Sequence, residues 1–230
     1  MVRDGAEVPQ VPLRFRERGR DITRLEGFSD CAFGFAITLL VLSLEVPSSF
    51  QQLLRLMSGV PVFAVTFAMI AYIWYTQYRF YRRFGVEDLS TIVLNMALLF
   101  VVLVYVYPLK FMFAALFRVE TPFEARGLFV LYGLGFCAVF LVLGLLYLNG
   151  LRQGVRLDLS AAERAMTRGW IEEQWLTAGI GIISVLLALV VPPSLLWLPG
   201  MWYFAIAGVR TVAGFRNRRR LRRFSAPNAG

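Results

Sequence analysis

The chain lacks histidine altogether and has only two cysteines and few charged side chains. The absence of histidine removes the commonest general base and the usual imidazole metal ligand, which disfavours an enzyme or a metal site. Cys31 and Cys137 both fall inside apolar segments, so they indicate no disulfide framework. With 17% charged and 58% hydrophobic residues, the 230-residue chain is too apolar for a soluble domain. The composition predicts an all-α polytopic membrane protein.

Long uncharged runs give the expected helices. Three runs, 56–78, 89–109 and 127–151, are each long enough to span a hydrocarbon core of about 30 Å. The run 174–209 would be about 54 Å long as one helix, so we divide it at Pro192-Pro193. Together with the first apolar segment, they predict six membrane helices, at about 25–47, 57–79, 89–112, 127–150, 173–191 and 195–213. Residues 1–23 form a polar arm without the apolar core of a signal peptide, and residues 216–230 form a basic tail.

The positions of the basic residues support six crossings with both termini in the cytoplasm. In that arrangement residues 1–24, the segments 79–89 and 152–173 and residues 210–230 hold 20 of the 24 basic residues. Cytoplasmic loops of membrane proteins carry such an excess. The tail segment 215–224 is expected to meet anionic lipid headgroups, and we favour this over nucleic-acid binding. Ser160 and Glu163 form a capping-box pattern, which predicts a cytoplasmic helix that leads into the fifth crossing.

The first apolar segment carries the most specific pattern of the chain, R-x-x-x-F-S-D, at Arg24, Phe28, Ser29 and Asp30. A carboxylate at this place in a membrane helix needs protein or water around it and a partner, for which Arg24 and Ser29 are candidates. The pattern and the run AFGFAITLLVL after it resemble the first helix of the transmembrane protein 175 family of potassium channels, in its bacterial single-repeat branch. Trp74, Asn95 and Pro108 match family positions on the second and third helices.

One face of this helix is a candidate pore lining. At about 100° per residue, Leu39 and Leu42 lie within about 40° of Phe35, with Phe28, Cys31 and Val46 on the same stripe. On periodicity alone, a seam for helix packing is the favoured interpretation of this stripe. The resemblance implies a homotetramer in which the first helices line a central pore. It places an apolar constriction at Phe35, Leu39 and Leu42, with Thr38, Cys31 and Val46 close by. Ser29 and Asp30 lie on another face and are expected, with Arg24, to form a structural polar network.

The chain departs from the family pattern at two places. Family members usually carry isoleucine or leucine where this chain has Phe35. Their second helix commonly has a His-His pair after the tryptophan, and Gln77 and Tyr78 stand there instead. Four phenyl rings in one layer would close the pore more tightly, or rotate and gate it.

The resemblance therefore implies a potassium-permeable cation channel in the cell membrane that needs no cofactor. Two other classes stay open, a non-conducting accessory or scaffold membrane protein and a secondary transporter. The sequence shows neither the inverted repeat nor the ionisable groups at mid-membrane depth that many secondary transporters use.

Overall fold

The computed structural model describes residues 15–41, 47–115 and 121–225, apart from the side chains at 55, 62, 110–115 and 218–225. Every regular element in these ranges is helical. The two short 3₁₀ turns are η1 (Pro193–Leu195) and η2 (Trp202–Phe204). The α-helices are α1 (Arg24–Val41), α2 (Phe50–Ser58), α3 (Val60–Phe84), α4 (Leu89–Ala115), α5 (Pro122–Arg152), α6 (Ala161–Val190), α7 (Leu198–Met201) and α8 (Ala205–Ser225).

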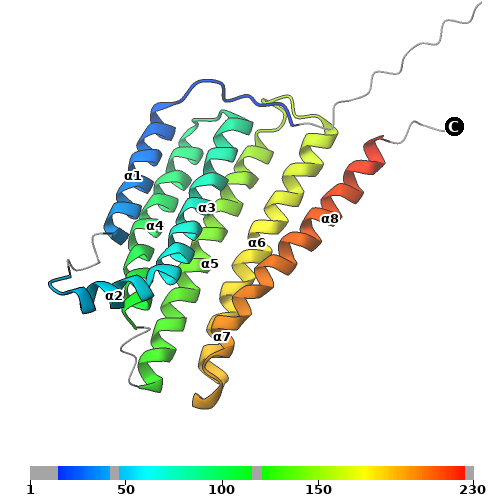
Figure 1. Cartoon of the computed structure of the whole chain (residues 1–230). Helices are drawn as coiled ribbons and strands as arrows, with labels where there is room; N and C mark the ends of the chain where they lie inside the picture. Colours follow the sequence, from blue (N-terminus) through cyan, green and yellow to red (C-terminus); the bar gives the residue numbers. More distant parts are fainter. Residues whose placement is uncertain (1–14, 42–46, 116–120, 226–230) are drawn as a thin grey trace, which may run out of the picture.

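The long helices run side by side in a single bundle, with α1 at one edge and α8 at the other (Figure 1). The start of α1, the end of α3, the start of α4, the end of α5, the start of α6 and the end of α8 all lie at the same end of the bundle (Figure 1). We call this the basic end because it carries many of the arginines, among them Arg16, Arg18, Arg20, Arg82, Arg83, Arg152 and Arg156.

Several helices have the length and composition of membrane spans. Within the described residues, α4, α5, α6 and the segment 193–217 each pass such a test, and α2 passes it only together with residues 63–84 of α3, from which it is bent by 50°. This confirms an all-helical membrane protein with at least four candidate spans. The described part of α1 is 18 residues, or about 27 Å, and the residues after Val41 lie outside the described part.

The helices at the basic end extend beyond the uncharged runs of the sequence. α3 continues through Arg79, Arg82 and Arg83 and stops only at Gly85, which adopts the left-handed conformation (φ 57°). α6 begins at Ala161 with the predicted capping box, in which Ser160 and Glu163 each bond the other's backbone N–H, and runs unbroken to Val190. A helix ends where a cap satisfies its terminal backbone N–H or C=O groups. A charged residue ends the uncharged run of the sequence but does not end the helix.

Between α6 and α8 the chain reverses through more structure than a single tight turn. After Val190 come Pro192, η1, α7 and η2, and α8 begins only at Ala205. The guanidinium of Arg126 on α5 donates to the backbone carbonyls of Ala188, Leu189 and Val191, at 2.6–3.2 Å. These carbonyls end α6, so Arg126 fixes the reversal to α5.

The α5–α6 pair forms the most extensive helix interface of the bundle. The two backbones approach closely at Gly133 and Gly181. A Cβ on Gly133 would lie 2.5 Å from Val185 Cγ2, and one on Gly181 would lie 2.8 Å from the carbonyl oxygen of Gly133. Membrane helices gain little from the hydrophobic effect when they associate, because lipid tails are as apolar as their side chains. Close packing holds them together instead, and small residues such as these glycines permit it.

The segment before α1 is bound across the basic end. Arg18 binds Glu163 of α6 through both terminal guanidinium nitrogens, each at 2.9 Å, and also donates to the carbonyls of Leu157 and Asp158. Phe15 packs against Phe84 and Trp170, with ring centroids at 5.6 and 5.3 Å. Through this segment, which leads directly into α1, the first helix is held to the start of α6.

Replacing Glu163 with glutamine is expected to destabilise the protein by about 2 kcal/mol, because it leaves the nearly buried Arg18 without its countercharge. In detergent the Tm should fall by about 4–8 °C. Glu17→Gln is the matched control, since Glu17 pairs with Arg82 at 3.3 Å in an exposed position and its loss should cost at most about 0.5 kcal/mol. Equal shifts for both variants would contradict a structural role for the Arg18–Glu163 pair.

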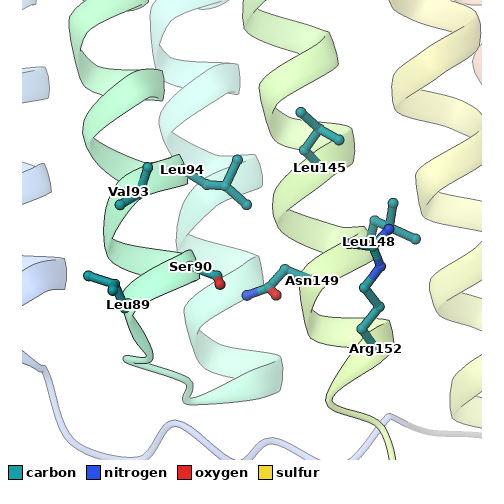
Figure 2. A pocket seen from close by; sticks show the side chains of 8 residues that line it. All are labelled: Leu89, Ser90, Val93, Leu94, Leu145, Leu148, Asn149 and Arg152. Atoms are coloured by element: carbon teal, nitrogen blue, oxygen red, sulfur yellow. The ribbon is translucent and has the colours of Figure 1, made fainter.

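A polar cluster joins α4 and α5 at the same end. Asp88 accepts hydrogen bonds from Thr91, Asn149, Gln153 and the backbone N–H of Ser90. Burial raises the pKa of Asp88, but these hydrogen bonds more than offset it and hold the pKa below its ordinary value. Figure 2 shows the pocket of about 440 Å³ beside the cluster, with Ser90 and Asn149 between α4 and α5 and leucines above them.

Candidate functional site

The first helix presents two different faces. Its buried face consists of Glu26, Ser29, Phe33, Ala36 and Leu40, at spacings of three and four residues. Phe33, Ala36 and Leu40 belong to the hydrophobic core formed with α3, α4 and α5. The buried face therefore packs α1 within its own subunit, whereas the opposite face is exposed in the single chain.

A buried polar relay holds α1 to α4 and α3. Ser29 donates to the carbonyl of Leu25 at 2.8 Å and accepts from Asn95 Nδ2 of α4, also at 2.8 Å. The Oδ1 of Asn95 accepts in turn from Gln77 Nε2 of α3. All three side chains are at most 1% exposed. Polar groups buried this deeply are costly unless paired, and the relay pairs them across three helices.

Asp30 is bound to α3 by a separate contact. Its Oδ1 accepts a hydrogen bond of 2.7 Å from Nε1 of Trp74, and the Trp74 ring stacks on Tyr78 at 5.8 Å. A short hydrogen bond to a charged acceptor is a strong one. The carboxylate therefore binds a helix of its own subunit, and its partner is Trp74 rather than Arg24 or Ser29. Among the described residues Arg24 makes no hydrogen bond or ion pair, and its side chain is exposed.

The exposed face carries most of the predicted pore residues that the structure describes. Phe35 is 67% exposed and Phe28 58% exposed, and Cys31 and Thr38 are exposed as well. The hydroxyl of Thr38 donates to the carbonyl of Gly34 of the same helix at 2.8 Å. We call Phe28, Cys31, Phe35 and Thr38 the exposed stripe.

Leu39 lies at the margin of this stripe, half-buried against the core. About 40° separates it from Phe35 around the helix, which is enough to bring it onto the flank packed in its own subunit. Leu42 and Val46, the other two predicted pore residues, lie outside the described residues. The exposed face of α1 therefore runs from Phe35 through Thr38 and Cys31, away from Leu39.

Comparison with known proteins decides the family. The model of the family described as endosomal/lysosomal potassium channel TMEM175 matches residues 24–108, which include α1, α3 and most of α4. A protein of Marivirga tractuosa named "Potassium channel" is 38% identical over 224 residues, with 87% of this chain and 89% of that protein covered. The chain belongs to the TMEM175 family. This is a family of ion channels, not of enzymes.

Two solved structures of TMEM175 proteins have the same fold. A variant of the potassium channel MtTMEM175, crystallised with a Nanobody-MBP fusion protein, superposes with a TM-score of 0.77 at 35% identity, covering 90% of this chain and 97% of that one. A lysosomal potassium-selective channel TMEM175 homolog from Chamaesiphon minutus gives a TM-score of 0.60 at 23% identity, covering 83% and 96%. The second likeness supports the fold alone.

Two residues of this TMEM175 site were not identified as such from the sequence. Gln77, noted there only as a replacement for a family histidine, is a member of the buried relay. Glu26 lies on the buried face at 7% exposure, and its backbone N–H is capped by Thr23. Its spacing of three residues from Ser29 and seven from Phe33 was the available signal.

Proposed function

We propose that this chain is the subunit of a potassium-permeable cation channel in which α1 lines the pore. The observation that carries the proposal is the exposed stripe on α1. A helix fixed on one side by the Ser29 relay and the Asp30–Trp74 bond cannot turn this stripe inward, so lipid or another subunit must cover it. The names of the relatives favour a pore, since both the Marivirga tractuosa protein and MtTMEM175 are named potassium channels.

The proposed subunit crosses the membrane six times, through α1, α3, α4, α5, α6 and α8. Both termini then lie in the cytoplasm with the basic end, in agreement with the excess of arginine there. One exposed helix cannot enclose a pore, so four copies are proposed to assemble around their α1 helices. The basic tail meets anionic headgroups of the cell membrane in this arrangement.

The proposed constriction consists of Phe35, Leu39 and Leu42, with Thr38, Cys31 and Val46 beside it. A ring of apolar side chains selects and gates by excluding water from the pore. Phe35, the most exposed of the described members, contributes the largest ring. The half-buried Leu39 is proposed to contribute only one edge of its side chain.

The test is potassium flux into proteoliposomes, combined with crosslinking through Cys31. The native protein should pass potassium, and oxidation should join subunits through Cys31, which is exposed, but not through Cys137, which is buried. Cys31→Ser is the control for the crosslink and should abolish it, whereas Cys137→Ser should not. A folded, oligomeric protein that passes no potassium would refute the channel, and a crosslink that survives Cys31→Ser would refute the position of α1.

A further inference from the structure

A groove opens on the bundle surface between α3 and the segment 200–210, which includes the start of α8, with α5 as its floor. It has a volume of about 550 Å³, and most of its lining is aromatic or aliphatic. α5 contributes four aromatic side chains, at Phe129, Tyr132, Phe136 and Phe140. The walls come from α3, with Val65, Ala68, Met69 and Tyr72, and from the segment 200–210, with Gly200, Tyr203, Phe204, Ile206 and Arg210.

The groove has the length of one lipid leaflet. Its lining on the α8 side runs from Gly200 to Arg210, about 15 Å at helical rise. This is half of the ~30 Å hydrocarbon thickness of a bilayer. Arg210 is the end of the groove nearer to the basic end, because α8 runs toward that end (Figure 1).

Arg210 is the one charged side chain of the lining, and its guanidinium is available to a ligand. The guanidinium carbon lies 3.7 Å from the centroid of the Tyr72 ring. Its Nε is buried without a hydrogen-bond partner, and within the described residues Arg210 makes no hydrogen bond through its other nitrogens either. A guanidinium N–H without an acceptor is costly, so an anion that binds the Arg210 guanidinium would offset part of that cost.

The charges around Arg210 favour an anion. Glu173 of α6 lies within electrostatic range of both Arg210 and Arg79, and no ion pair joins Arg210 to Glu173 in the described part of the chain. Two guanidinium groups against one carboxylate leave an excess of one positive charge. Arg79 is five residues, or about 8 Å along the helix, from the last residue of α3 at the basic end.

We propose that this groove binds an anionic phospholipid from the leaflet at the basic end of the bundle. One acyl chain lies along the aromatic floor of α5, and the phosphate accepts hydrogen bonds from Arg210. Aromatic and aliphatic walls with a single cation at the leaflet surface match the two parts of such a lipid. The site lies on α3, α5 and α8, away from the exposed stripe of α1, and does not depend on the proposed pore.

The test is native mass spectrometry of the full-length protein in mild detergent, with phosphatidylglycerol or phosphatidylcholine of the same acyl chains added. Phosphatidylglycerol should be retained preferentially, and Arg210→Gln should weaken its binding about fivefold, the effect of one charge at the surface. Arg216→Gln is the matched control, since Arg216 is an exposed arginine of the same helix outside the groove, and should change binding by less than about twofold. Ala68→Trp keeps the charge and fills the groove, and should reduce binding as strongly as Arg210→Gln.

Three results would overturn the proposal. Equal losses for Arg210→Gln and Arg216→Gln would mean that headgroups meet only the general positive surface. Equal retention of the two lipids would mean a neutral acyl-chain groove, and retention that is unaffected by Ala68→Trp would place the lipid elsewhere. If Arg210→Gln does not fold, Ala68→Trp decides, because residue 68 is exposed and Arg210 is intact in that variant.

Discussion

Replacing Phe35 with alanine is expected to raise potassium flux about tenfold. In the proposed tetramer four Phe35 rings form one layer of the constriction, and a tenfold rise corresponds to about 1.4 kcal/mol of barrier removed. Loss of the rings widens the layer and lets water enter with the ion, so the apolar barrier falls. Because the Phe35 side chain is exposed in the single subunit, its replacement removes few contacts within the subunit. The Tm should therefore change little.

Phe215→Ala is the matched control for this experiment. Phe215 on α8 is 62% exposed, close to the 67% of Phe35, but it lies on the helix at the other edge of the bundle (Figure 1). Its replacement should leave flux unchanged. Leu39→Ala should raise flux less than Phe35→Ala and cost about 2 kcal/mol of stability, because Leu39 is half-buried against the core. If Phe35→Ala and Phe215→Ala conduct alike, Phe35 is no part of the constriction.

Replacing Asn95 with leucine is expected to destabilise the fold by about 3 kcal/mol and to lower the Tm by about 6–12 °C. Asn95 is the centre of the relay, so its loss leaves the buried Ser29 hydroxyl without a donor and the Gln77 amide without an acceptor. Hydrogen bonds between membrane helices are worth about 0.6 kcal/mol on average, but here two such bonds are lost at once in a closed core and the Gln77 amide keeps no acceptor among them. Thermal unfolding in detergent measures the effect.

A double-mutant cycle separates the relay from simple packing. Ser29→Ala alone should cost less than Asn95→Leu, and the two together should cost less than their sum by about 0.5–1 kcal/mol, since the Ser29–Asn95 bond is lost only once. Asn217→Leu serves as the comparison, because the Oδ1 of Asn217 has no hydrogen-bond partner in the described structure. Strict additivity of Ser29→Ala and Asn95→Leu would contradict a shared hydrogen bond.

Asn95→Leu and Phe35→Ala test opposite faces of α1, and we expect one to change stability and the other to change conduction. Asn95→Leu acts on the buried face and should lower stability, whereas Phe35→Ala acts on the exposed stripe and should alter conduction. The expected combination is a lowered Tm for Asn95→Leu and a raised potassium flux for Phe35→Ala. This combination would mean that the relay holds α1 in its rotation and that the exposed stripe of the same helix controls conduction.

Much of the fold could be predicted from the sequence, because the apolar runs and prolines are local signals. The runs of α3, α4 and α5, the break at Pro192 and the capping box of Ser160 and Glu163 all appear in the structure. The lengths of the helices at the basic end could not be predicted in this way. The uncharged run of the second helix ends at Tyr78, but α3 continues to Phe84. An arginine at the membrane surface keeps its charge in water without ending the helix.

The sequence by itself determined the class of protein, the family motif on the first helix and the fact that Ser29 and Asp30 lie away from Phe35. These follow from composition and from the fixed turn of a helix, which depend only on residues near in sequence. Only the tertiary structure decided that Trp74 binds Asp30, that Gln77 completes the relay with Asn95, and that Leu39 is half-buried beside an exposed Phe35. These contacts join residues up to 66 positions apart, and which side chains meet depends on how whole helices pack, a choice that no local pattern contains.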